Sequence, residues 1–345
     1  MKKTIFFLLC TVFLFSACKK DRGQYNPCGT TQIEQLDVQV IESYTTLPSK
    51  VSVFCRVETV QGEPVAGLEP SDFTIYEKGR NDDCEREISS FEANSVISSP
   101  QQLFYYNTIL VLDLSASVTA TSLFELKDAA RRFIDEIMPA DGDPAYFMGI
   151  WWFDGEDVLH ELIAPTTNKE DLKQAVSEIT QDISNDPSTD LYGAVIKSTD
   201  IAEQWLNEAG QSEISTALSV VIFTDGTDQA GRYLKSDAIN AVNSSNRNIR
   251  YFTIGLGGEI DANVLKSIGK NGSVTATNQS ELEETFRQVG QLVWAEANSY
   301  YLFEYCSPKR DGSGMNDLRI EAHSNGKVGS ATTKFDATGF TGGCQ

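Results

Sequence analysis

The chain has 345 residues and a formal net charge of −21, with 49 Asp and Glu residues against 28 Lys and Arg residues. This acidity disfavours nucleic-acid binding, because contacts to phosphates need clustered Lys and Arg. The length is enough for two or three domains, and an apolar content of 41% supplies a substantial core.

The N-terminus has the pattern of an export signal. Two lysines precede an apolar run over 5–15 that is too short to be a comfortable transmembrane helix. A Phe-Ser-Ala-Cys sequence ending at Cys18 resembles the lipobox of bacterial lipoproteins, with phenylalanine in place of the usual leucine. We therefore predict a signal peptide over 1–17, a lipid on Cys18 and a tether over 18–33, with a plain signal peptide as the alternative. The expected location is the bacterial outer membrane or the cell surface, with the membrane reached through the lipid anchor.

The cysteines indicate disulfides and not zinc. Five remain after the signal peptide and Cys18 are set aside, and the exported setting is oxidising. They are Cys28, Cys55, Cys84, Cys306 and Cys344. At most two disulfides can form, which leaves one free thiol, and the pairing is open. A zinc site is not expected, because these cysteines are scattered and the chain has only two histidines.

From 34 to 100 the chain has the pattern of β-structure. Residues 51–57 alternate between apolar and polar side chains, and 73–77 form a second strand candidate. Glycine and proline separate the two runs and predict turns between them.

Strands alternate with helices from 105 to 299. A strand over 109–112 comes first. The further segments are helices over 122–138, 168–179, 190–206 and 280–297, and strands over 147–153, 217–223 and 249–256. This order predicts an α/β fold with a doubly wound, mostly parallel sheet, in which ligands bind outside the carboxyl ends of the strands.

The last segment, 300–345, returns to β-structure. Strand candidates cover 300–305 and 317–322, and Asn325-Gly326 predicts a hairpin turn. We expect this segment to pack with the N-terminal β segment as a small β-sandwich, with 105–299 inserted between them.

Five oxygen-bearing side chains stand at predicted strand ends and loops. Asp113, Ser115 and Ser117 follow one buried strand at alternate positions, so they would point the same way in an extended segment. Thr189 lies in a later loop, and Asp225 follows the strand over 217–223. Hard oxygens gathered at the edge of a sheet favour a small divalent cation.

Here the chain resembles the von Willebrand factor A (VWA) family, whose metal-ion-dependent adhesion site consists of an Asp-x-Ser-x-Ser strand end, a Thr and an Asp in this order. The resemblance implies that Ser115, Ser117 and Thr189 contact the metal directly, while Asp113 and Asp225 act largely through waters or hydrogen bonds. It implies Mg²⁺ as the cation, with Mn²⁺ or Ca²⁺ as alternatives. A Glu or Asp of a protein or other macromolecular partner would complete the metal shell.

One departure from some relatives and one further resemblance bear on this expectation. Val118 and Thr119 stand where some relatives place acidic residues for an adjacent second cation, so that second site is not expected here. The segment 67–77, together with 88–91, resembles the small β-sandwich module that precedes the VWA domain in some bacterial proteins.

Two other functions are alternatives to adhesion, namely catalysis and a structural role. A serine hydrolase would need a base, and the pattern places neither His160 nor His323 near the strand ends, so no enzyme activity is expected. Asp228 could line the metal loop or hold a turn. Asp154 and Asp157 could bind a stray cation, but a solvated loop is the favoured interpretation. The alternative to adhesion is a structural scaffold of an envelope assembly, in which the metal only supports folding.

Overall fold

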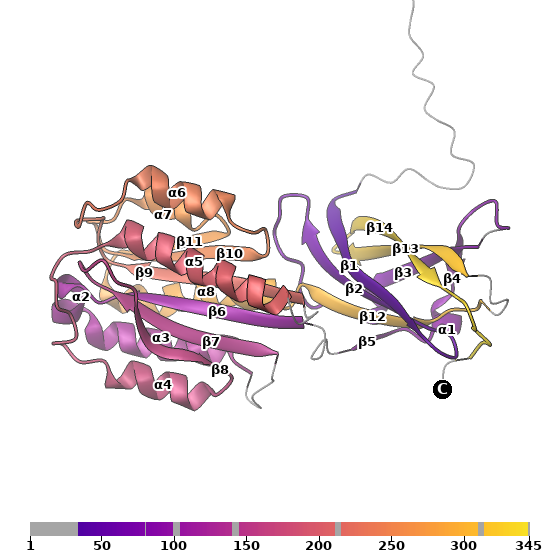
Figure 1. Ribbon diagram of the computed structural model, residues 1–345, viewed down its shortest axis with the longest axis horizontal. Coiled ribbons are helices and arrows are strands. Elements are labelled where there is room, and N and C mark those ends of the chain that lie inside the picture. Colours follow the sequence, from indigo (N-terminus) through magenta and orange to yellow (C-terminus); the bar gives the residue numbers. More distant parts are fainter. Residues whose placement is uncertain are drawn as a thin grey trace, which may run out of the picture.

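The computed structural model describes residues 34–79, 81–98, 104–139, 145–210, 215–309 and 314–343. Two bodies lie along its long axis, one with helices around a sheet and one made mostly of strands (Figure 1). The predicted signal peptide, the lipidated cysteine and the tether lie outside the described residues, as do Cys28 and Cys344. Within the described ranges, no helix is both long and apolar enough to cross a bilayer.

The first body is built on a six-stranded sheet. Its strands are β6 (Phe104–Asp113), β7 (Tyr146–Phe153), β8 (His160–Thr166), β9 (Ser215–Thr224), β10 (Ile249–Leu256) and β11 (Gly272–Ala276). Their order is β11-β10-β9-β6-β7-β8. Neighbouring strands run parallel except β8, which is antiparallel to β7. The predicted fold class is therefore confirmed.

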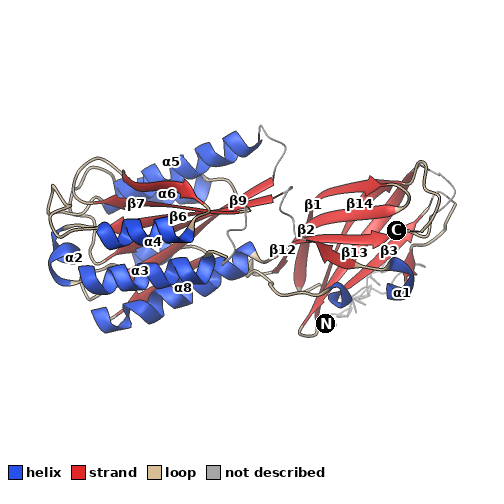
Figure 2. Ribbon diagram, turned by 90° about the horizontal axis from the view of Figure 1, so that it is seen from below, coloured by secondary structure: helices blue, strands red, loops and turns tan. Residues whose placement is uncertain are grey.

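Helices cover both faces of this sheet (Figure 2). They are α2 (Ala116–Thr121), α3 (Leu123–Ile137), α4 (Lys169–Glu178), α5 (Leu191–Gly210), α6 (Lys235–Ser244), α7 (Ala262–Ile268) and α8 (Leu282–Ala297), with a 3-10 turn over Gln279–Glu281. One face packs on α3, α4 and α8, and the other on α5, α6 and α7. The sequence did not predict α2, α6, α7 or β11.

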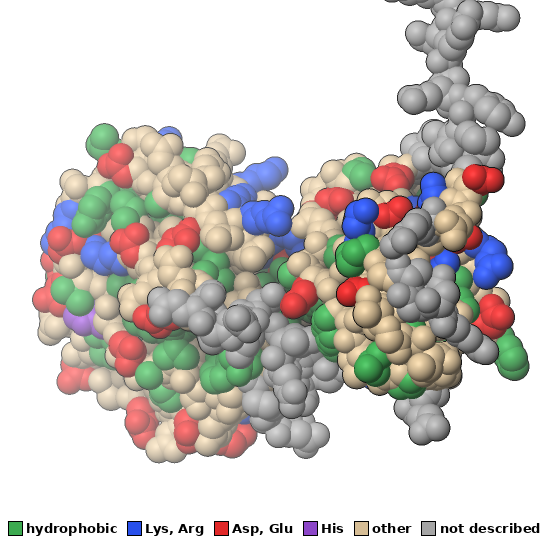
Figure 3. All heavy atoms as spheres, turned by 45° about the vertical axis from the view of Figure 1, so that its right-hand side comes forward, with side chains coloured by type: hydrophobic (Ala, Val, Ile, Leu, Met, Phe, Trp, Pro, Cys, Tyr) green, Lys and Arg blue, Asp and Glu red, His purple; other side chains and the backbone are tan. Residues whose placement is uncertain are grey.

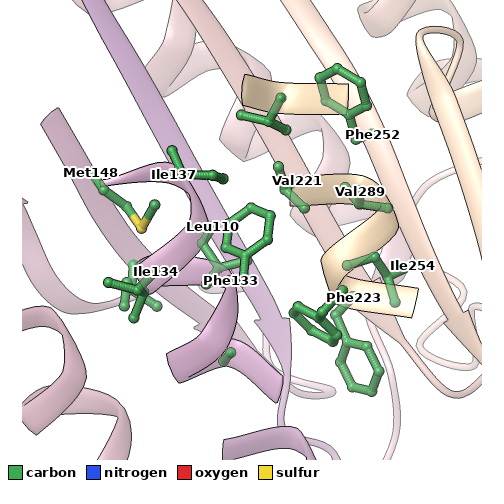
Figure 4. Packing of buried hydrophobic residues seen from close by; sticks show 14 of the residues in the cluster. Leu110, Phe133, Ile134, Ile137, Met148, Val221, Phe223, Phe252, Ile254 and Val289 are labelled. Carbon is green, nitrogen blue, oxygen red and sulfur yellow. The ribbon is translucent and has the colours of Figure 1, made fainter. Parts of the chain in front are cut away.

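The all-apolar strands are explained by burial on both faces. In β6, Leu110 belongs to the core beneath α3 and α8, whereas its neighbour Val111 belongs to the core on the other face. Phe133 of α3 and Val221 of β9 lie in the same cluster as Leu110 (Figure 4). Because successive side chains of a strand point to opposite faces, both sets must be apolar here.

The second body contains two antiparallel sheets, which we call the two-sheet module. One sheet has the order β1-β2-β12-β5, and the other β14-β13-β3-β4. Their bounds are β1 (Leu36–Thr46), β2 (Lys50–Thr59), β3 (Phe73–Lys78), β4 (Arg86–Ile88), β5 (Val96–Ser98), β12 (Tyr300–Cys306), β13 (Met315–Ser324) and β14 (Lys327–Asp336), with short helical turns at Pro70–Asp72 and at Ser90–Ala93, which is α1.

The two ends of the chain are interleaved in this module. Strand β12 pairs with β2, and β13 pairs with β3. Val53 and Phe303 from one sheet share a core with Ile75 and Ile320 from the other. The expected packing of the N-terminal and C-terminal β segments is therefore observed, and the α/β body is inserted between them.

Strand β2 also faces the α/β body, which the sequence pattern did not predict. Its alternation indicated one exposed face, but every residue after Lys50 in the strand is buried. Phe54 belongs to the core of the α/β body, where its ring lies 5.4 Å from that of Phe104. Tyr300 stacks on Phe104 at 4.4 Å. The start of β6 therefore lies at the junction, and the strand points away from the module.

A buried charge network crosses the same junction. The Arg56 Nη2 atom lies 2.7 Å from Glu58 Oε2 and 2.8 Å from Glu296 Oε1. Arg250 Nε lies 2.9 Å from the same atom of Glu296. Burial raises the pKa of Glu296 to about 7, and the charge of Arg56 offsets only part of this effect.

Acidic side chains are otherwise dispersed. On the face shown in Figure 3, Asp and Glu side chains are scattered over both bodies. This face therefore has no single acidic patch. Among the described residues, Cys84 takes part in a disulfide, and so does Cys306. Cys55 is a buried free thiol.

Candidate metal centre

The first part of the site is the turn from β6 into α2. Asp113 is the last residue of β6, Ser115 is the N-cap of α2, and Ser117 is the second residue of that helix. The Asp113 Oδ1 atom accepts a hydrogen bond from Ser115 N at 3.0 Å. The expectation of three alternate positions on one extended strand was therefore wrong. A strand end followed at once by a helix brings the oxygens together instead.

The neighbouring strand β9 supplies the second part. Ser117 Oγ donates to Asp225 Oδ1 at 2.9 Å, and the hydroxyls of Ser115 and Ser117 are 3.3 Å apart. Thr224, the last residue of β9, donates its hydroxyl to Asp113 Oδ2 at 2.6 Å. The role of Thr224 was missed, although a polar residue at the end of an apolar strand is a signal that could have indicated it.

Thr189 supplies the third part from the loop before α5. Its side chain is almost fully buried, and a Cβ placed on Gly226 would lie 3.8 Å from Thr189 Oγ1. The carbonyl of Thr189 accepts hydrogen bonds from Gln229 N at 2.8 Å and Ala230 N at 3.1 Å. The structure thus brings Thr189 against the loop that begins at Asp225. All five predicted residues lie at one edge of the sheet, near α2 and at the end of the molecule opposite the two-sheet module (Figure 1).

Two carboxylates meet here without a cationic side chain. Asp113 is fully buried, and burial raises its pKa to about 6, with a smaller increase from the charge of Asp225. Burial also raises the pKa of Asp225, and Glu259 adds to the effect. The main contributions to both shifts are burial, hydrogen bonds and a neighbouring carboxylate, and not the charge of a Lys or Arg. A bound cation would remove this electrostatic penalty.

The donor set fits a hard divalent cation. It consists of two carboxylates and three hydroxyls, so every donor is an oxygen. Oxygen donors suit Mg²⁺, Mn²⁺ or Ca²⁺, whereas zinc structural sites use nitrogen and sulfur. With only two carboxylates, such a site would leave room for a further anionic ligand.

The other acidic candidates have different surroundings. Asp228 accepts hydrogen bonds from Tyr192 N and Gly231 N, each at 3.0 Å, which is a turn and loop-bridging role. Asp157 is more than half exposed and pairs with Lys197 at 2.6 Å. The expectation of a solvated loop was wrong for Asp154, which is fully buried.

A second group of potential ligands surrounds Asp154. Its ligand atoms and those of Glu156 and His160 all lie within 4.8 Å of one another. Asp154 Oδ1 accepts from Glu156 N, and Oδ2 accepts from Ser184 Oγ, Asn185 N and Asp186 N. Three of the four donors converge on Oδ2 and one is on Oδ1, so the surrounding loops already use most of the acceptor capacity of Asp154. These hydrogen bonds account for the burial of this carboxylate without a cation.

Both histidines have local structural contacts. His160 stacks on Trp152 with ring centroids 4.0 Å apart, and its Nε2 lies 3.3 Å from Glu156 Oε2. His323 Nε2 lies 3.1 Å from Glu321 Oε1 in the two-sheet module. Neither histidine contacts Ser115 or Ser117.

The fold and the site agree with a family assignment. Residues 107–288 match the model of the von Willebrand factor type A domain, which is more than half of the 345 residues. The chain therefore belongs to the von Willebrand factor type A family. All five site residues lie within the matched segment.

Several solved structures resemble the chain at low identity. Proximal thread matrix protein 1 from the mussel byssus, solved with a zinc-occupied MIDAS motif, has a TM-score of 0.46 and 18% identity over 56% of this chain and 48% of that one. A von Willebrand factor type A protein from Catenulispora acidiphila has a TM-score of 0.45 and 12% identity over 92% and 76%. Manganese-loaded TRAP protein from Plasmodium vivax has a TM-score of 0.45 and 14% identity over 71% and 97%. The chain spans about half the length of the mussel protein. No curated protein matches it.

Proposed function

We propose that this protein binds a divalent cation, Mg²⁺ in the first place, through Asp113, Ser115, Ser117, Thr189 and Asp225, and that the cation binds an acidic group of a protein or other macromolecular partner. The observation that carries this proposal is the convergence of five oxygen side chains from three loops, two of them carboxylates that have no cationic partner among the described residues. When bound, the cation would supply a positively charged centre for the partner's Asp or Glu.

The residues of the chain have separable roles in this proposal. Thr224 and the backbone of Ser115 hold the Asp113 carboxylate in place. Ser117 connects α2 to Asp225, so the two loops approach the cation together. In this proposal the direct ligands are neutral hydroxyls, and the two carboxylates act largely through waters or hydrogen bonds. The cation therefore has few anionic groups in direct contact and favours an anionic ligand. The contacts of both histidines lie elsewhere, which supports a binding role and not catalysis by an activated serine.

The position of the site suits a surface receptor. It lies at the pole of the α/β body away from the two-sheet module, whereas the first described residue, Glu34, leads into β1 of that module. We propose that Cys18 carries a lipid and that the tether over 18–33 joins the membrane to the module. The domain limits that we propose are 34–100 and 300–345 for the β segments and 105–299 for the VWA domain. A protein arranged in this way would present its site away from the outer membrane.

Capture of envelope or extracellular proteins by the immobilised chain tests this function. We expect capture in Mg²⁺ that is lost in chelator and lost in the Asp113→Ala variant. If Asp113→Ala captures the same partners while its melting temperature falls, the cation supports folding only and the scaffold alternative replaces the adhesion function.

A further inference from the structure

Asp154 lies beside the proposed cation site but does not belong to it. It follows the last residue of β7, Phe153, which pairs with Asp113 on β6. Its side chain is fully buried. A buried carboxylate is costly unless hydrogen bonds satisfy it, so its partners show what it holds in place.

Those partners are concentrated in the segment that leads to Thr189. Oδ2 of Asp154 accepts hydrogen bonds from Asn185 N at 2.9 Å, Asp186 N at 3.0 Å and Ser184 Oγ at 3.1 Å. The backbone carbonyl of the same residue accepts from Asp190 N at 2.8 Å. Asp154 therefore fixes the segment at two points, one on each side of Thr189.

The residues between these two contacts of Asp154 are held by further hydrogen bonds and packing. Asp186 Oδ1 accepts from Ser188 N at 3.0 Å and from Ser188 Oγ at 2.7 Å. The segment also packs on the backbone of Gly155, where an added Cβ would clash with Ser188 Oγ. Thr189 is thus held by its neighbours on one side, while its own carbonyl is held by Gln229 and Ala230 on the other.

We propose that Asp154 is a positioning residue that sets the Thr189 hydroxyl at the cation site. This inference rests on the proposed function and adds a residue that acts only through Thr189. Partners that orient metal ligands without touching the metal typically change metal affinity by about 10-fold to 100-fold when they are mutated. Asp154 has the geometry of such a partner, because three of the four donors to its carboxylate belong to the segment that leads to Thr189.

Asp154→Asn is the informative variant. Asparagine has nearly the same size, but it is neutral and keeps only one acceptor oxygen, so its amide nitrogen must face either the donors of residues 184–186 or Glu156 N. We expect the affinity for Mn²⁺, measured by the loss of the free-ion electron paramagnetic resonance signal, to fall at least about tenfold. Thr189→Ala should also weaken binding, and the double variant should bind no more weakly than Thr189→Ala alone.

The matched control is Glu296→Gln, which also neutralises a buried carboxylate of the α/β body but does so at the junction with the module. It should bind Mn²⁺ with wild-type affinity even where its melting temperature falls. If Asp154→Asn is unfolded at the assay temperature, Ser184→Ala removes one donor and should weaken Mn²⁺ binding a few-fold in the wild-type chain and not in Thr189→Ala.

Wild-type affinity in Asp154→Asn, or in Ser184→Ala where that variant replaces it, would overturn the inference. An effect that adds in full to that of Thr189→Ala would also overturn it, because Asp154 would then act by another route. Absence of Mn²⁺ binding by the wild-type chain would overturn the proposed function itself, and this inference with it.

Discussion

Ser117 on α2 donates its hydroxyl to Asp225 after β9 at 2.9 Å, which joins two segments separated by more than a hundred residues. The bond extends a series of contacts that begins at Asp113, at the end of β6, and continues through Ser115. Both residues lie where the sheet ends and the loops begin, so their approach follows from the parallel order of β6 and β9. The proposed cation site depends on this approach.

Ser117→Ala should reduce cation affinity with little change in stability. The Ser117 side chain is exposed, and truncation of an exposed side chain usually changes the free energy of unfolding by less than about 0.5 kcal/mol. We expect at least about a tenfold loss in Mg²⁺ affinity by titration calorimetry. Ser177→Ala, another exposed serine on a helix, is the control and should bind as the wild type does. Equal affinity in Ser117→Ala would remove this residue from the site.

Thr224→Val should destabilise the chain in the absence of metal. The substitution keeps the shape of the side chain but removes the hydroxyl that donates to the buried Asp113 carboxylate. Loss of a hydrogen bond to a charged group costs roughly 1.5–3 kcal/mol. Urea unfolding in chelator would measure it. Thr253→Val, which is equally buried but loses only neutral partners, should cost less. A smaller effect for Thr224→Val than for this control would show that the Asp113 contact contributes little.

The stability of the chain should depend on pH through Glu296. Burial raises its pKa from 4.5 to about 7, so the folded state holds a proton over a range in which the unfolded state has lost it. The folded state binds more protons between these values, and stability therefore falls as pH rises from about 4.5 to about 7. We expect this fall, up to a few kcal/mol, in the wild type and a flatter profile in Glu296→Gln. Parallel profiles for the two proteins would contradict it.

Cys55 should be unreactive while the chain is folded. Its thiol is buried in the core of the two-sheet module, and burial raises its pKa to about 12. A thiolate is the reactive form, so the native protein should resist a thiol reagent and react only on unfolding. The measurement is labelling with and without denaturant, followed by mass determination. Rapid native labelling at Cys55 would show that the module opens.

The sequence predicted most of the α/β body and the five site residues because both depend on local order. Asp113 and Asp225 follow long apolar strands, and the ends of parallel strands meet at one edge. Burial of Phe54 could not be predicted in this way. Its partner Phe104 comes from a distant segment, and the pairing exists only once the second body packs against the first.

Asp154 was predicted wrongly for a related reason. A lone aspartate after a strand is commonly a solvated turn residue, and nothing in the neighbouring sequence indicates donors about thirty residues away. Ser115 and Ser117 were expected on a strand but lie at the start of a helix, for a local reason. The apolar run ends at Leu112, β6 ends one residue later, and the short helix α2 precedes the well-patterned α3.

Titration of the purified chain with Mg²⁺, in the wild type and in Asp225→Asn, tests the cation site most directly. Asn preserves the shape of the side chain but removes the charge, and Asp225 is only partly buried, so folding should survive. We predict one bound Mg²⁺ per chain in the wild type and an affinity at least about tenfold lower in Asp225→Asn, at unchanged melting temperature in chelator. No binding by the wild type, or equal binding by both proteins, would contradict the cation site.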